Sequence, residues 1–271
     1  MILGALLTVP GTVLVVLAAI RRPGLLASPA ELGAAVQSLA LTFGGLTTVI
    51  AVNAVLLVGV CGAAAALSPL PARARLGLGR PRLGAGGIAF CVLGALACSQ
   101  ALDGLVDLCG LGEVGFLARF RDLAAHLPAA RLVVLALIMG ALPGFGEELF
   151  FRGYMQTRLA ARWGAARAIV VSGLLFGLLH LDPVQSPLAA CLGLYLGLVA
   201  VRAGSIWPAI IAHTVNNVVA VLTAALVPGP TGRPLGIALF IGGAAVGGAV
   251  LVWLRRTPAG APAAQEDAHA V

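Results

Sequence analysis

Long apolar stretches separated by short polar segments run through most of the chain. Eight of them approach or exceed the ~20 apolar residues with which an α-helix crosses about 30 Å of hydrocarbon. These stretches are residues 1–20, 31–67, 84–102, 131–146, 166–181, 187–201, 206–226 and 235–254. The pattern predicts an all-α fold, a polytopic integral membrane helix bundle with about eight transmembrane helices.

The stretch 31–67 leaves two counts open. As one long span it gives eight crossings, whereas a hairpin that turns at Gly44–Gly45 gives nine. Two crossings need about 40 apolar residues, and this stretch has fewer. We therefore expect eight spans.

Three regions follow from the pattern. Residues 1–130 hold the first spans, and a segment near 111–128 places apolar side chains at helical spacing against charged ones, which is typical of a helix in the membrane interface. Residues 131–256 hold the remaining spans and the ionisable residues described below, which make them the candidate catalytic core. Residues 257–271 are rich in Ala and Pro without apolar periodicity, which indicates a disordered tail.

Composition and charge agree with a membrane protein. Hydrophobic residues make up 60% of the 271 residues and charged ones 10%, whereas a soluble domain has roughly 25% charged residues. The net charge of +7 arises from arginine, which is the only basic residue besides histidine. Most arginines lie between spans, where basic loops stay on the cytoplasmic side and contact anionic lipid. We therefore expect a multi-pass protein in a bacterial-type cell membrane. Its basic residues should contact the lipid bilayer, and we expect no nucleic-acid partner.

The five cysteines show no CxxC or paired spacing. We expect them to be small core residues, with neither a disulfide framework nor a metal site.

Ionisable residues inside spans are costly, so each needs an explanation. The sequence GEELFFRGYMQTR contains Glu147, Glu148 and Arg152. On a helix, Glu148 and Arg152 lie four residues apart on one face, while Glu147 is turned by about 100°. We infer an ion pair between Glu148 and Arg152 that leaves Glu147 free. A purely structural ion pair would explain the first two residues but not the third.

Two histidines also fall inside spans. His180 follows Phe176 by one helical turn, so the ring can brace the imidazole, and His213 precedes Asn217 by one turn. At 1.5 Å per residue these groups and Glu147 lie about 16–22 Å from the arginines that flank their spans, at a similar depth. We expect Asp103 and Asp107, at the opposite end of their span, to lie outside this site.

In this order, Glu147-Glu148-x-x-x-Arg152, Phe176-x-x-x-His180 and His213-x-x-x-Asn217 resemble the CPBP family of intramembrane proteases. That family includes the CAAX prenyl-protein endopeptidases and bacterial proteins grouped as abortive-infection (ABI) or bacteriocin self-immunity proteins. The resemblance covers about 147–217. It implies that Glu147 and His180 activate the attacking water, that His213 and Asn217 donate to the oxyanion, and that Glu148 and Arg152 complete the first motif.

This chemistry needs no cofactor. A glutamate out of bulk water suits a general base, and donors fixed before charge develops stabilise a tetrahedral intermediate. We expect an intramembrane endopeptidase that cleaves a membrane-associated protein or peptide, with the site opening toward the cytoplasm.

Two alternatives remain open. Glu147, His180 and His213 also supply the donors of a His₂Glu zinc protease, although HExxH is absent. A transporter or an immunity scaffold is the non-enzymatic alternative, although no paired repeats of the kind found in transporters are evident.

Overall fold

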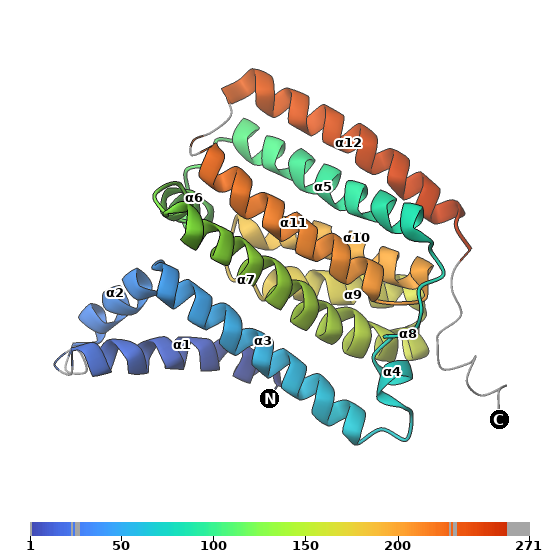
Figure 1. Cartoon of the computed structure of the whole chain (residues 1–271), viewed down its shortest axis with the longest axis horizontal. Helices are drawn as coiled ribbons and strands as arrows, with labels where there is room; N and C mark the ends of the chain where they lie inside the picture. The colour runs from blue at the N-terminus through green and yellow to red at the C-terminus, as the bar shows by residue number, and fades with distance from the viewer. Residues whose placement is uncertain (1, 23, 25–27, 228, 230–231, 259–271) are drawn as a thin grey trace.

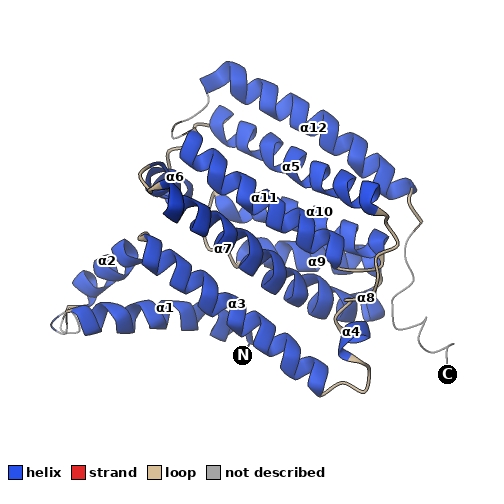
Figure 2. Ribbon diagram, in the orientation of Figure 1, coloured by secondary structure: helices blue, strands red, loops and turns tan. Residues whose placement is uncertain are grey.

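The computed structural model describes residues 2–22, 24, 28–227, 229 and 232–258. Within this part of the chain every regular element is a helix (Figure 2). The helices are α1 (Ile2–Arg21), α2 (Pro29–Ala40), α3 (Phe43–Ala66), α4 (Ala72–Arg75), α5 (Ala85–Leu108), α6 (Gly115–Ala125), α7 (Ala129–Glu148), the π-helix η2 (Leu149–Gln156), α8 (Thr157–Trp163), α9 (Ala165–Leu178), α10 (Gln185–Ala203), α11 (Trp207–Leu226) and α12 (Gly232–Arg256). Most of the predicted tail, residues 259–271, lies outside the described residues.

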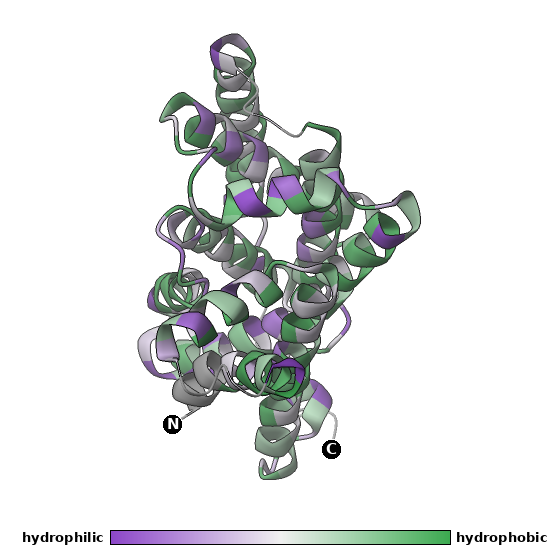
Figure 3. Ribbon diagram, turned by 90° about the vertical axis from the view of Figure 1, so that its left-hand side faces the viewer, coloured by the Kyte–Doolittle hydropathy of each residue, from purple (hydrophilic) through white to green (hydrophobic). Residues whose placement is uncertain are grey.

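The helices form a polytopic bundle. Six in the described ranges are long and apolar enough to cross a membrane: α3, α5, the continuous helix Ala129–Trp163, α10, α11 and α12. Two shorter apolar helices, Val9–Arg21 and Ala165–Leu178, occupy the other two predicted spans. Figure 3 shows hydrophobic residues in green along most of the helices, and less than half of each candidate span is buried within the bundle. The predicted fold class is confirmed, and the protein is a multi-pass membrane protein.

The stretch 31–67 is not one helix. It divides between α2 and α3 at Thr42, whose hydroxyl donates to the Leu39 carbonyl over 2.7 Å and accepts from the Gly45 amide over 3.0 Å. The twelve residues of α2 extend about 18 Å, too short for a crossing. The stretch therefore supplies one span and a short helix that packs on α1 and α3.

Helices that are far apart in the sequence pack side by side. Figure 1 shows α12, α5, α11, α7 and α3 side by side, with α9 and α10 behind α7 and α11. The helix α6 lies across one end of the bundle, where Phe116 and Phe120 pack with Leu135 and Val221. The arginine-bearing helices α4 and α8 lie at the opposite end.

Two elements differ from regular spans. The helix that begins as α7 continues after Glu148 as η2, and π-helical turns inside α-helices are frequent at functional sites. The predicted span 166–181 is only α9, which ends at Leu178 and extends about 21 Å. The turn that follows contains Leu181 with a φ of 52°, a left-handed conformation that is uncommon for a residue with a side chain.

Glycine allows the close contacts around these elements. A Cβ on Gly153 of η2 would lie 2.6 Å from the Leu76 carbonyl oxygen, and one on Gly177 of α9 would overlap the Ser186 backbone. Both glycines thus permit close approach of the neighbouring backbone.

Candidate active site

The predicted ion pair between Glu148 and Arg152 is present. Arg152 Nη1 donates to Glu148 Oε1 over 2.7 Å, and both side chains are completely buried. Arg152 Nη2 donates to the Gly193 carbonyl of α10 over 2.8 Å, and the guanidinium lies 4.7 Å from the centre of the Phe176 ring. The pair therefore ties η2 to α9 and α10 at the point where α7 ends.

The same carboxylate holds His213. His213 Nδ1 lies 2.9 Å from Glu148 Oε1, and it must donate because an ionised carboxylate only accepts. The other ring nitrogen, Nε2, then points at Glu147, with 3.9 Å between Nε2 and Oε2. Glu147 has no hydrogen bond to any described side chain, and 16% of it is exposed. One acid of the pair is fixed behind the site and the other faces it.

Phe176 separates the two histidines. Its ring centre lies 5.1 Å from that of His180 and 5.7 Å from that of His213, edge-on to both. His180 Nδ1 lies 3.0 Å from the Phe176 carbonyl oxygen, to which it donates. In a neutral His180, Nε2 is therefore the nitrogen that can accept a proton or a hydrogen bond.

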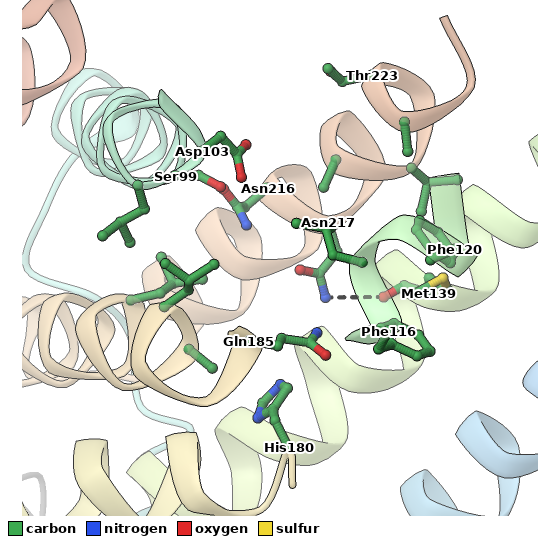
Figure 4. Close-up of a pocket in the computed structure, with 18 of the residues that line it drawn as sticks. Ser99, Asp103, Phe116, Phe120, Met139, His180, Gln185, Asn216, Asn217 and Thr223 are labelled. Carbon is green, nitrogen blue, oxygen red and sulfur yellow. Dashed lines mark hydrogen bonds between the residues drawn. The ribbon is translucent and has the colours of Figure 1, made fainter. Parts of the chain in front are cut away.

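Asn217 completes the predicted set. Its Nδ2 donates to the Met139 carbonyl of α7 over 3.1 Å, as Figure 4 shows, and an amide nitrogen carries a second hydrogen. The bond fixes the amide plane and leaves one donor for another partner.

These groups meet in one cavity of about 590 Å³. Glu147, Phe176, His180, His213 and Asn217 all line it, whereas Glu148 and Arg152 lie behind its wall. Leucine, valine and phenylalanine side chains from α3, α6, α10 and α11 form much of the rest of the lining. The cavity can therefore hold an apolar chain segment against a small set of polar groups.

The cavity also includes residues that the sequence did not assign. Asp103 and Asp107, which were expected to lie elsewhere, line it from α5, and Asn216 lines it from α11. Helical rise relates each side chain to one membrane face, so it does not reveal that the cavity continues toward the opposite face. The pair Asn216-Asn217 in an otherwise apolar helix was the signal for the third residue.

The cavity extends toward the α6 end of the bundle. Its lining includes Phe116 and Phe120 of α6 and Val227 after α11, and none of its described lining residues comes from α4 or α8. Figure 1 places α6 at the end opposite α4 and α8. The expectation that the site opens toward the cytoplasm stays a prediction.

Asp182 links α6 to the turn between α9 and α10, beside the cavity. Its Oδ2 accepts from the Phe116 amide over 3.0 Å, and its Oδ1 accepts from the amides of Val184 and Gln185 over 2.9 and 2.8 Å. Burial alone would raise the pKa of Asp182. The hydrogen bonds from these three amides and the nearby His180 have the larger, opposite effect, so the pKa lies below its ordinary value of 3.8.

The arrangement of these motifs agrees with a comparison to protein families. Residues 129–219 match the family described as type II CAAX prenyl endopeptidase Rce1-like. Over these residues the chain is similar to the Rce1-like family. The match contains every motif position from Glu147 to Asn217 and ends before α12, which the predicted core had included. No curated protein and no solved structure matched the chain.

The family gives the class of activity. Rce1-like proteins are CAAX-type endopeptidases, so the protein is a hydrolase that acts on peptide bonds within the membrane. Among the described residues of this protein, no three His, Cys, Asp or Glu side chains are grouped so as to hold a metal ion. Glu147, His180 and His213 are thus neighbours on one wall without forming a three-ligand cluster.

Proposed function

We propose that the protein hydrolyses a peptide bond of a membrane-associated protein or peptide with water activated by Glu147 and His180, and without a metal. The observation that carries this proposal is the position of Glu147, which faces the cavity and His213 Nε2 while its neighbour Glu148 is fixed behind the wall.

Glu147 supplies the base. A water molecule at hydrogen-bond distance from Glu147 fits beside His213 Nε2, since a separation of 3.9 Å leaves room for an oxygen that contacts both groups. As the water oxygen attacks the substrate carbonyl carbon, its proton passes to Glu147. His180 Nε2 accepts the second hydrogen bond of the water and orients it.

His213 and Asn217 serve the oxyanion. In this proposal His213 carries a proton on Nε2 as well as on the Nδ1 that donates to Glu148, so that Nε2 can donate to the oxyanion. The second Nδ2 hydrogen of Asn217, one turn along α11, is the other donor. When the intermediate collapses, the C–N bond breaks and the leaving nitrogen takes the proton held by Glu147.

The intermediate is non-covalent in this proposal. Among the described residues, no serine or cysteine is hydrogen-bonded to His180 or His213, so none is activated as a nucleophile there. The apolar lining and the membrane setting favour a substrate segment that is lipid-associated or itself spans the bilayer. We place the protein in a cell membrane with its arginine-rich loops in the cytoplasm.

The test is Glu147→Gln, which removes the base at nearly equal volume. We expect cleavage to fall by roughly 10²–10⁴-fold or more while the protein still inserts and folds. The measurement compares the termini of membrane proteins between wild-type cells and variant cells, with exposed Glu31→Gln on α2 as the matched control. Unchanged fragments in the Glu147→Gln cells would refute the role of Glu147 and favour a scaffold.

A further inference from the structure

A second polar surface lies across the cavity from the catalytic candidates. Ser99, Gln100 and Asp103 line the cavity from α5, and Asn216 lines it from α11. Figure 4 shows the Asn216 side chain directed from α11 toward α5, next to Ser99 and Asp103. We call these four residues the α5–α11 polar wall.

Two members of this wall have side-chain oxygens without a hydrogen-bond partner among the described residues. Asn216 is only 5% exposed, and its Oδ1 is buried with no hydrogen-bond partner among the described residues. Asp103 makes no hydrogen bond with any described residue, and it interacts electrostatically with Arg121 and Asp107. A buried acceptor without a donor and a carboxylate within a span are both unfavourable, so groups of this kind are ordinarily satisfied by something that binds.

The chemistry of the missing partner follows from these atoms. A carboxylate and an amide oxygen accept hydrogen bonds, and a serine hydroxyl can also accept, so the partner must donate. Among the described lining residues the charged groups are four carboxylates, Asp103, Asp107, Glu147 and Asp182, with Arg121 and, in the proposed mechanism, His213 as cations. Arg121 pairs with Asp107 over 3.7 Å and also attracts Asp103, so the two carboxylates of α5 share one guanidinium. The cavity therefore favours a cation.

We propose that the α5–α11 polar wall is a substrate subsite for a basic side chain, with Asp103 pairing the charge of a substrate lysine or arginine and Asn216 Oδ1 accepting one of its N–H groups. The inference rests on the proposed protease function, because it names the substrate class of the same cavity. Asn216 lies three residues after His213, a rise of about 4.5 Å along α11, and an extended peptide advances about 3.3 Å per residue. The basic residue therefore lies within about one to three residues of the scissile bond.

The experiment uses matched apolar peptides that carry lysine, norleucine or glutamate at one position near the cleaved bond. Cleavage is measured with the full-length protein in lipid, and binding is measured with its Glu147→Gln variant, which keeps the wall intact. We expect wild type to prefer lysine over norleucine by roughly tenfold or more in kcat/KM, and the variant to bind the lysine peptide more tightly.

Two substitutions locate the preference. Asp103→Asn should remove the preference for lysine over norleucine, and Asn216→Ala should weaken this preference. Asp122→Asn on α6 is the matched control, because its side chain is 80% exposed and lies outside the cavity lining. Equal binding of the lysine and norleucine peptides, including no binding of either, would overturn the subsite, as would a lysine preference that survives in Asp103→Asn.

The outcomes separate this inference from the proposed function. If Glu147→Gln abolishes cleavage but wild type shows no preference for lysine, the subsite is refuted and the proposed mechanism stands. If Glu147→Gln cleaves normally, the mechanism is refuted, and peptide binding still decides the subsite.

Discussion

His213 and Arg152 donate to the same oxygen of Glu148, over 2.9 and 2.7 Å. One carboxylate thereby fixes the orientation of the catalytic histidine candidate and compensates a buried guanidinium on the neighbouring turn. In the proposed mechanism Glu148 is therefore a positioning residue for His213, and the motif Glu147-Glu148-x-x-x-Arg152 combines one reactive acid with one anchoring acid.

Loss of Arg152 should destabilise the protein. Arg152→Met leaves the Glu148 carboxylate in a buried site without its cation, and breaking such a pair costs about 3–5 kcal/mol. Unfolding in mild detergent measures the effect. The double variant Glu148→Gln/Arg152→Met should recover part of the loss, and additive losses would show that the two residues do not interact energetically.

Loss of Asn217 should slow the chemical step. Asn217→Ala removes one oxyanion donor, for which we expect a decrease in kcat of roughly 10²–10³-fold with little change in KM. Asn53→Ala on α3, outside the cavity lining, is the matched control. A rise in KM with unchanged kcat would assign Asn217 to substrate binding instead.

The sequence predicted the Glu148–Arg152 ion pair better than it predicted the helix boundaries and the extent of the cavity. A four-residue spacing brings Glu148 to Arg152 on almost any helical turn, so the pair formed even though that turn is π-helical. The break at Thr42 depends on one hydroxyl that bonds the backbone on both sides, and hydropathy does not detect it. The extension of the cavity toward α6 depends on contacts between residues distant in sequence, such as the bond from the Phe116 amide to Asp182, and hydropathy does not detect these either.

The Asp182 contact should depend on pH. Because the folded-state pKa lies below 3.8, the contribution of Asp182 to stability is complete above its ordinary pKa and is lost as the pH falls through the lowered value. Asp182→Asn should therefore unfold more easily than wild type at neutral pH, and the difference should shrink in strong acid. Thermal unfolding across pH measures it, and a difference that is constant with pH would exclude the charge as the cause.

Labelling can determine which face of the membrane the cavity reaches. In a variant with its five cysteines replaced, we expect Asp122→Cys on α6 to react with an impermeant maleimide in intact cells, and Trp163→Cys on α8 to react only after permeabilisation. The reason is that arginine-rich loops remain in the cytoplasm. The reverse labelling would place the cavity toward the cytoplasm.

Metal removal separates the two protease mechanisms. The proposed mechanism moves a proton from water to Glu147, so we expect a chelator to leave the cleavage rate unchanged. A loss of activity that zinc restores would instead favour a His₂Glu zinc site made by Glu147, His180 and His213.

The shortness of α9 also affects the lipid around it. A helix of about 21 Å beside a hydrocarbon layer of about 30 Å is a hydrophobic mismatch, which neighbouring acyl chains relieve by tilting and compressing. We therefore expect the bilayer to be thinner next to α9, which ends at Leu178, two residues before His180, and water to have a shorter path to the candidate site there. Acyl-chain length thus becomes a determinant of the cleavage rate, because the surrounding lipid sets how far the site lies from water.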